Sequence, residues 1–349
     1  MEGKNVDNVG RVVPLYYNLE SLWPDRSYAA IHKPNIKTDA LRDVAASFFE
    51  NMMRVDYLSL LPTTFVCMSQ RPLNGGMVVY YNCNRSAPIV STNAWSFYED
   101  LSNPELFKKR MIDGMRYIEN WSGEQDRGIQ AWLSSLLLGT WTSFEAFVCD
   151  LWVATVNANP RILARLAGTA KRIHLRAVAA GRDAPAESRQ ENDMKIPIKR
   201  IHDLTNGTYD VNLRMGAILK SRVAFTRLSD VRRAYSLAFD EKKIDARLVV
   251  AVDEALADSA LDALSAIRNL IIHKASIADE EYVKRAKAVN KAGLAIPQLA
   301  EGQPLQLDGV IVKSLVDPVV ACCLKLFVAI DGWLTEGSLA PGYEAGAGI

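Results

Sequence analysis

The chain has 349 residues, of which 41 are Lys or Arg and 40 are Asp or Glu, giving a formal net charge of +1. This balance excludes a globally basic nucleic-acid-binding protein, so any RNA-binding surface must come from local clustering of charge. Apolar residues make up 49% of the chain, enough for a sizeable core. The length predicts two domains, or one large domain with additions.

The distribution of cysteine and histidine argues against a metal site. There are five cysteines and four histidines. No C-x-x-C pair occurs and the histidines are scattered, so we expect neither zinc nor another cofactor. An odd number of cysteines favours a reducing compartment.

No targeting or membrane-spanning segment is expected. The first residues lack the apolar stretch of a signal peptide. The longest uncharged run, residues 128–144, leads into Glu145 and suits a buried helix better than a membrane span. We therefore expect a cytoplasmic protein without membrane contact.

The first 125 residues predict an α+β region. Residues 38–54 carry apolar positions at helical spacing. Residues 63–69 and 77–83 are short, β-rich apolar runs around PLNGG, which predict a β-hairpin. A further helix is expected over 103–119, with Pro104 in its first turn. No catalytic pattern occurs here, so the region is either a specificity or sensing module or an extension packed on the rest.

The strongest helical pattern runs from Gln130 to about Asn157. One face of this helix is apolar, and its members are Trp141, Phe144, Val148, Leu151 and Trp152. Glu145 lies at the edge of that face. A carboxylate there needs a cationic partner if it is buried, because an unpaired buried charge is costly. The alternative is a half-exposed Glu on an amphipathic helix.

A basic stretch follows. Residues 151–182 contain no acid, and their six cations are Arg161, Arg165, Lys171, Arg172, Arg176 and Arg182. Backbone phosphates of RNA are one plausible partner. The alternative is a solvated helix face balanced by acids elsewhere, such as Asp253, Asp258 and Asp262.

A second helix ends close to the most distinctive residues of the chain. Apolar residues recur at helical spacing from Leu256 to Ile271, and His273 and Lys274 fall in the last turn, where cations are favoured. Ser276 and Asp279 have the spacing of a capping box, which predicts that Ser276 opens the next helix. Capping also explains this acidic segment without a metal ion.

Arg268, Asn269 and His273 form a candidate site at that helix end. Five residues separate the Arg from the His, which is about 140° of rotation and about 7.5 Å of rise on an ideal helix. Asn269 is one turn before His273 and could orient its imidazole. Arg grips phosphate oxygens and His moves protons near neutral pH. The plain alternative is surface charge at a helix end, since Arg26 and His32 show a similar spacing by chance.

RNLIIHKASIADEEYVKR, which begins at Arg268, resembles the Arg-polar-x-x-x-His signature of the HEPN superfamily, and WTSFEAFVCDLW, which begins at Trp141, resembles the first long helix of that domain. The resemblance covers roughly residues 127–333, with an insertion. It implies an all-α domain that pairs as a dimer and often acts as a metal-independent endoribonuclease. It further implies Arg268 and His273 as the catalytic pair, supported by Asn269 and by Glu145 as partner of the Arg.

These observations together predict a mainly α protein. We expect a HEPN-like helical bundle over 126–336 with a basic insertion around 160–215, an α+β region over 1–125, and a disordered tail over 337–349. The last helix, which closes the bundle, is expected to begin near Pro318.

The expected function is cleavage of RNA by attack of its own 2′-hydroxyl, at a composite site in a homodimer. The expected RNA contacts are Arg161, Arg165, Lys171, Arg172, Arg176 and Lys274. A defence or toxin system would suit such a domain, and a neutralising or regulatory protein could be a further partner. The alternative is a catalytically inactive module that binds RNA or a protein.

Overall fold

The computed structural model describes residues 36–73, 123–166, 172–173, 211–242, 244–291 and 296–336. Within these ranges the chain is helical, and its one β-type pairing is a single bridge between Ile277 and Pro304. The prediction of a mainly α protein is therefore confirmed. The expected tail over 337–349 lies outside the described residues.

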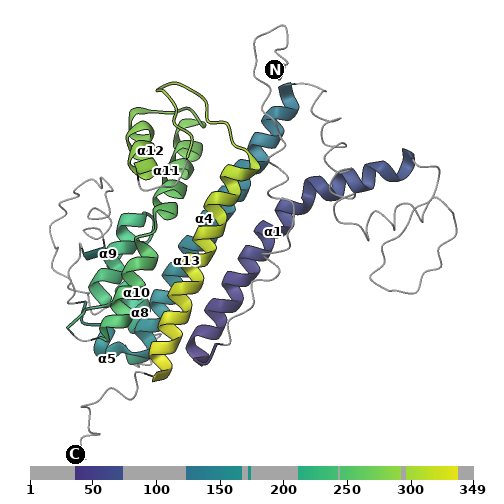
Figure 1. The fold of residues 1–349 in the computed structure, drawn as a ribbon. Coiled ribbons are helices and arrows are strands. Elements are labelled where there is room, and N and C mark those ends of the chain that lie inside the picture. The colour runs from purple at the N-terminus through teal and green to yellow at the C-terminus, as the bar shows by residue number, and fades with distance from the viewer. Residues whose placement is uncertain are drawn as a thin grey trace, which may run out of the picture. The chain divides into compact units, whose positions relative to one another are not determined.

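The described helices are of two sizes (Figure 1). The three long ones are α1 (Asp39–Leu73), α4 (Gly123–Ala158) and α13 (Gly309–Glu336). The shorter ones are α5 (Pro160–Leu163), α8 (Val211–Lys220), α9 (Leu228–Ala238), α10 (Ala246–Leu256), α11 (Ser259–Lys274) and α12 (Glu280–Lys291).

The chain divides into two compact units that are not contiguous in sequence. The larger, here the bundle unit, takes the described residues of 31–53, 137–305 and 314–349. The smaller takes those of 54–136 and 306–313. The boundary expected at residue 125 lies inside α4, and the first part of α1 belongs to the bundle unit.

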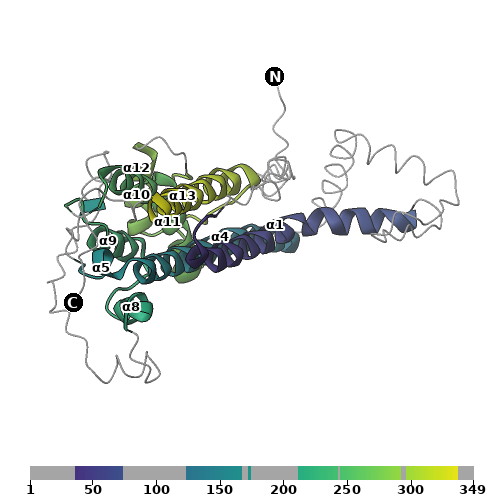
Figure 2. The ribbon, with the colours of Figure 1, turned by 90° about the horizontal axis from the view of Figure 1, so that it is seen from below.

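Aromatic side chains join the long helices within the bundle unit. The ring of Phe48 on α1 lies 4.6 Å from that of Phe147 on α4, which lies 6.0 Å from Phe327 on α13. The α4 face predicted to be apolar is buried throughout. In Figures 1 and 2, α9 and α10 lie along this end of α4 and α13. Trp152 ties α4 to α9, because its Nε1 donates to the carbonyl of Ala234 at 3.2 Å.

The burial of α4 is relevant to the question of whether this helix spans a membrane. Residues 127–158 are long and apolar enough to cross one by length and composition alone. However, 61% of its most apolar 18-residue stretch is buried inside the protein. A core helix passes the same test, so the hydropathy of α4 is weak evidence for a span.

Two local predictions are wrong. Residues 63–69, expected as a β-strand, lie in α1, which continues past Arg54 to Leu73. A short apolar run fits a buried helix as well as a strand, and periodicity alone cannot separate them. The last helix begins at Gly309, where Asp308 accepts a hydrogen bond from the Ile311 amide at 2.8 Å. Pro318 therefore lies inside α13 rather than near its start.

The second expected strand, residues 77–83, and the expected helix over 103–119 lie outside the described residues, as does most of the expected basic insertion around 160–215.

Candidate functional site

The candidate residues lie on α11, which is well anchored in the bundle unit. Asp258 caps its first turn by accepting from the Ala260 amide at 2.8 Å. Leu261, Leu264 and Ile267 are completely buried. The helix stays regular through His273 and ends at Lys274. The rotation of about 140° between Arg268 and His273 therefore holds, and within one chain their side chains leave the helix in different directions.

Arg268 is half-buried and held by two neighbours. Its Nη1 donates to Asn269 Oδ1 at 2.9 Å, and its guanidinium carbon lies 6.0 Å from the ring centroid of Trp141 on α4. A cation over an indole face is attracted by the ring quadrupole. Asn269 thus bonds the Arg rather than the imidazole that it was expected to orient.

Two buried donors at this contact have no acceptor among the described residues. They are Nε of Arg268 and Nε1 of Trp141. Leaving a buried donor unsatisfied costs about 1–3 kcal/mol. An acceptor oxygen bonded to either donor would remove that cost for the donor it binds, and an anionic oxygen would also interact favourably with the guanidinium charge. Both atoms are buried, so an acceptor from outside can reach them only if neighbouring side chains move.

His273 is exposed in the last turn of α11. Large apolar side chains are exposed on both sides of it in sequence, with Ile272 at 47% and Ile277 at 48% of full exposure. Lys274 is exposed too, and its Nζ lies 3.3 Å from Asp279 Oδ2. The imidazole is thus free to meet a ligand or a second chain.

The turn after α11 is fixed by the loop that precedes α13. Ala275 and Ser276 adopt left-handed backbone angles, with φ of 49° and 63°. The carbonyl of Ser276 accepts from the Leu305 amide at 2.7 Å, and the amide of Ala278 donates to Gln303 O at 2.8 Å. These bonds tie the turn that follows His273 to that loop.

Asp279, and not Ser276, caps α12. Its Oδ1 accepts from the Tyr282 amide at 2.9 Å, and the helix begins at Glu280. This bond, with a smaller contribution from Lys274, holds the pKa of Asp279 below its usual value. The capping-box prediction placed the helix start too early, because Ser276 lies in a left-handed turn and the capping carboxylate is that of Asp279.

Glu145 does not pair with Arg268. It is half-buried on α4, and no ion pair joins the two side chains in the described part of the chain. The guanidinium of Arg268 is instead occupied by Asn269 and Trp141.

The residues predicted to contact RNA differ in their exposure to solvent. Arg161 and Arg165 are exposed at the end of α5. Arg172 is buried, and its Nε and Nη2 donate to the carboxylate of Asp253, which is completely buried, at 3.0–3.2 Å. Its Nη1 donates to Ser236 O. Arg172 is therefore a structural residue and not an RNA contact, and Lys171 and Arg176 lie outside the described residues.

A second buried arginine, Arg232, also forms an ion pair within the bundle unit. Arg232 donates from Nε to Leu256 O at 2.8 Å and from Nη1 to Asp262 Oδ1 at 2.8 Å. The acids considered as counter-charges for the basic stretch, Asp253 and Asp262, are thus both paired with arginines inside the bundle unit.

One basic cluster was missed. Lys284, Lys287 and Lys291 are exposed on α12. Their spacing of three and four residues was visible in the sequence as one helix face. No group of three or more His, Cys, Asp or Glu side chains in the described ranges is placed to hold a metal ion.

Comparison of the chain with models of protein families, with curated proteins and with solved structures found no match.

Proposed function

We propose that this protein is a metal-independent endoribonuclease of the HEPN type, with Arg268 and His273 as its catalytic residues. The 2′-hydroxyl oxygen of RNA attacks the adjacent phosphorus, and the bond to the 5′-oxygen of the next nucleotide breaks. His273 takes the proton from the hydroxyl or gives one to the leaving oxygen. Arg268 balances the charge that develops on the phosphoryl oxygens. The products are a 2′,3′-cyclic phosphate and a 5′-hydroxyl end.

The observation that carries the proposal is the environment of Arg268. Asn269 and the Trp141 ring contact its guanidinium, and its buried Nε donates to no acceptor in the described part of the chain. A restrained cation with spare donors is what stabilisation of a phosphoryl group requires, because no reorganisation is then needed during the reaction.

The geometry of α11 favours a site built from two chains. Within one chain, about 140° of helix rotation separates the Arg from the His. In a two-fold dimer the same surface meets itself, so a His from one copy can approach an Arg from the other. The exposed Ile272 and Ile277 supply apolar surface beside His273 for such a contact.

The separation of Arg268 from His273 around the helix also supports the alternative function, a helical module that binds RNA or a protein without cutting. In that case Arg268 holds a phosphate or an acidic side chain, and His273 is a surface residue. The two functions differ in a single observable, the appearance of cyclic phosphate ends.

The deciding experiment is incubation of the purified full chain with single-stranded RNA in excess EDTA. We expect cleavage with cyclic phosphate ends, and its loss in Arg268→Ala and in His273→Ala. Lys325→Ala, an exposed cation on α13, is the control and should cut normally. Full activity of His273→Ala would remove this assignment. Binding without cleavage by the wild type would select the alternative.

The setting follows from the function proposed. A cytoplasmic ribonuclease of this type would serve in a defence or toxin system, where a neutralising or regulatory protein keeps it inactive. Co-purification from cells under conditions that silence the activity would identify such a partner.

A further inference from the structure

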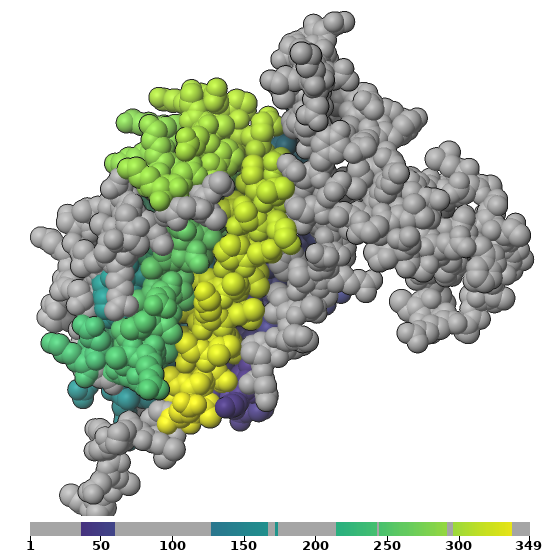
Figure 3. All heavy atoms as spheres, viewed as in Figure 1, coloured from purple at the N-terminus to yellow at the C-terminus, as the bar shows by residue number. Residues whose placement is uncertain are grey.

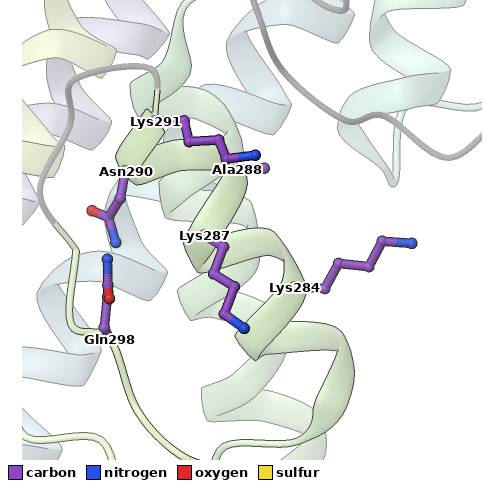
Figure 4. Close-up of a pocket in the computed structure, with 6 residues that line it drawn as sticks. All are labelled: Lys284, Lys287, Ala288, Asn290, Lys291 and Gln298. Carbon is purple, nitrogen blue, oxygen red and sulfur yellow. The ribbon is translucent and has the colours of Figure 1, made fainter.

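A shallow, open pocket of about 470 Å³ lies on α12. It is lined by Lys284, Lys287, Ala288, Asn290, Lys291 and Gln298. Figure 4 shows the three lysines in succession along the helix, with Asn290 and Gln298 on the side of the following loop. We name the surface formed by Lys284, Lys287, Lys291 and Gln298 the α12 basic face.

The lysines are on the side of α12 opposite to its buried face. On an ideal helix Lys284, Lys287 and Lys291 fall within an arc of about 60°. Tyr282, Ala286 and Val289, which are the buried residues of α12, fall on the other side. In Figure 3 the segment that contains α12 is uncovered at one end of the bundle unit.

These lysines have no acidic partner in the part of the chain that the structure describes. Arg285, the remaining cation of the helix, is paired with Glu281 at 2.7 Å. Glu280 shares the face of the lysines, but it lies in the first turn, outside the pocket. Three unpaired ammonium groups within two turns repel one another, so an anion that neutralises them is favoured.

Hydrogen bonds hold the described residues on the other side of the pocket. Asn290 exchanges two hydrogen bonds with the backbone of Ile296, at 2.9 and 3.2 Å. The buried Tyr282 hydroxyl donates to Pro297 O at 2.8 Å. Gln298 follows directly, and its exposed amide has no partner among the described residues. It can donate to a phosphate oxygen or to a base edge without rearrangement of the loop.

We propose that the α12 basic face binds the phosphate backbone of single-stranded RNA and delivers the strand to the end of α11. The choice of RNA as the ligand rests on the proposed function. Successive lysines along a helix match the repeating charge of a nucleic-acid strand, and binding releases the counterions of that strand. The face lies on the helix that follows the candidate residues, and α11 and α12 are in close contact.

An anionic membrane is a poorer occupant for this face. A helix that lies on a membrane inserts large apolar side chains below its cations. The exposed large apolar residues of the described chain include none on α12. The pocket presents Ala288 and an amide beside the lysines, which suits a hydrated phosphate strand.

The test measures binding of a short 2′-O-methyl single strand, which lacks the attacking hydroxyl, by fluorescence anisotropy across a salt series. The full chain is compared with the triple variant Lys284→Gln, Lys287→Gln, Lys291→Gln. Each phosphate contact of a single strand contributes about 0.7 to the slope of log K against log salt. We expect the slope to fall by about 2, and the affinity at moderate salt to fall roughly 10- to 100-fold.

Two further variants control the measurement. Lys→Arg at the same three positions keeps the charge and should keep the slope. Lys242→Gln, Arg247→Gln, Lys325→Gln removes as much charge from other exposed positions and should change the slope much less. Circular dichroism and thermal melting verify that all variants are folded.

The outcomes separate this inference from the proposed function. An unchanged slope in the Lys→Gln variant overturns it, even if the wild type cuts RNA through His273. A wild type that binds anionic vesicles or an acidic peptide but no RNA also overturns it. Binding of RNA through α12 with no cleavage supports it, while the endoribonuclease proposal fails.

Discussion

The guanidinium carbon of Arg268 on α11 lies 6.0 Å from the ring centroid of Trp141 on α4, and each side chain has a buried N–H with no acceptor among the described residues. The contact joins two helices that are far apart in sequence. Because both N–H groups are buried, an acceptor from outside the described residues has to displace neighbouring side chains to reach them.

The first prediction concerns Trp141 as a positioning residue. In Trp141→Leu the guanidinium loses its ring contact, which is worth about 0.5–2 kcal/mol, so RNA cleavage should slow roughly 2- to 30-fold. The readout is kcat at a temperature where the variant is folded, since a loss confined to KM would indicate weaker binding instead.

Trp152→Leu is the matched control. It removes another buried indole from α4, one that bonds Ala234 O and does not touch Arg268. Both variants should be destabilised, but only Trp141→Leu should lower kcat. Equal kcat in the two would show that Trp141 is a core residue with no effect on Arg268.

The second prediction tests whether the site is shared between chains. Arg268→Ala and His273→Ala should each be inactive, but a mixture that exchanges subunits should recover activity. If the site takes Arg from one chain and His from the other, half of the dimers are mixed and each has one intact site of two. The expected recovery is thus about a quarter of wild-type activity. No recovery, with exchange verified by differently tagged chains, would place both residues in a site of one chain.

Much of the fold was predictable because the apolar periodicity of buried helices is strong. The apolar face of α4 was identified residue by residue and is buried. The stripe predicted from Leu256 to Ile271 was expected as one helix, but Leu256 ends α10, α11 begins at Ser259, and Ile271 is only half-buried. The strand expected at residues 63–69 failed because a run that short has no distinguishable period. The start of α13 was missed because Pro318 was taken as a boundary, although Asp308 provides the cap ten residues earlier.

The candidate site was predictable in part. Local spacing placed Arg268 and His273 on one helix end, which the structure confirms. The side chains that these residues contact in the folded protein could not be predicted from the sequence. Counting charges could not reveal that Arg172 pairs with the fully buried Asp253, more than eighty positions away in the sequence. Likewise, Asn269 was expected to serve His273, but the adjacent guanidinium competes for its oxygen.

The third prediction follows from the burial of Arg172. Arg172→Leu removes the guanidinium that donates to the completely buried Asp253 carboxylate, and we expect a loss of about 3–5 kcal/mol in the free energy of unfolding. The double variant Arg172→Leu, Asp253→Leu replaces the pair by apolar side chains and should recover most of that loss. Urea denaturation measures both, and a double variant no more stable than the single one would contradict the pairing.

The fourth prediction concerns the cap that starts α12. Asp279→Ala should cost about 1 kcal/mol of stability, because the amide of Tyr282 loses its acceptor. Asp279→Asn keeps an oxygen there and should cost less. Since the folded-state pKa of Asp279 is below the usual 3.8, its contribution is present above that pH and is lost as the pH falls through the lowered value. The measurement is the free energy of unfolding as the pH is lowered. If it falls equally steeply in wild type and in Asp279→Asn, this prediction is contradicted.

The last prediction uses the buried hydroxyl that fixes the pocket loop. Burial raises the pKa of Tyr282 from 10 to about 12. Below pH 10 the phenol is protonated in both states. Between about pH 10 and 12 the unfolded chain releases this proton while the folded chain keeps it, so stability falls as the pH rises. The slope from one such proton is at most about 1.4 kcal/mol per pH unit.

Tyr282→Phe should remove that component and flatten the alkaline part of the stability curve relative to wild type. It also deletes the hydrogen bond to Pro297 O, which should lower stability by about 1 kcal/mol at neutral pH. Tyr57→Phe, at an exposed tyrosine on α1, is the control and should leave the curve unchanged. Parallel curves for wild type and Tyr282→Phe from pH 9 to 12 would show that the hydroxyl ionises alike in both states. If Tyr282→Phe also weakens RNA binding while the three lysines remain, the loop that it anchors takes part in the α12 basic face.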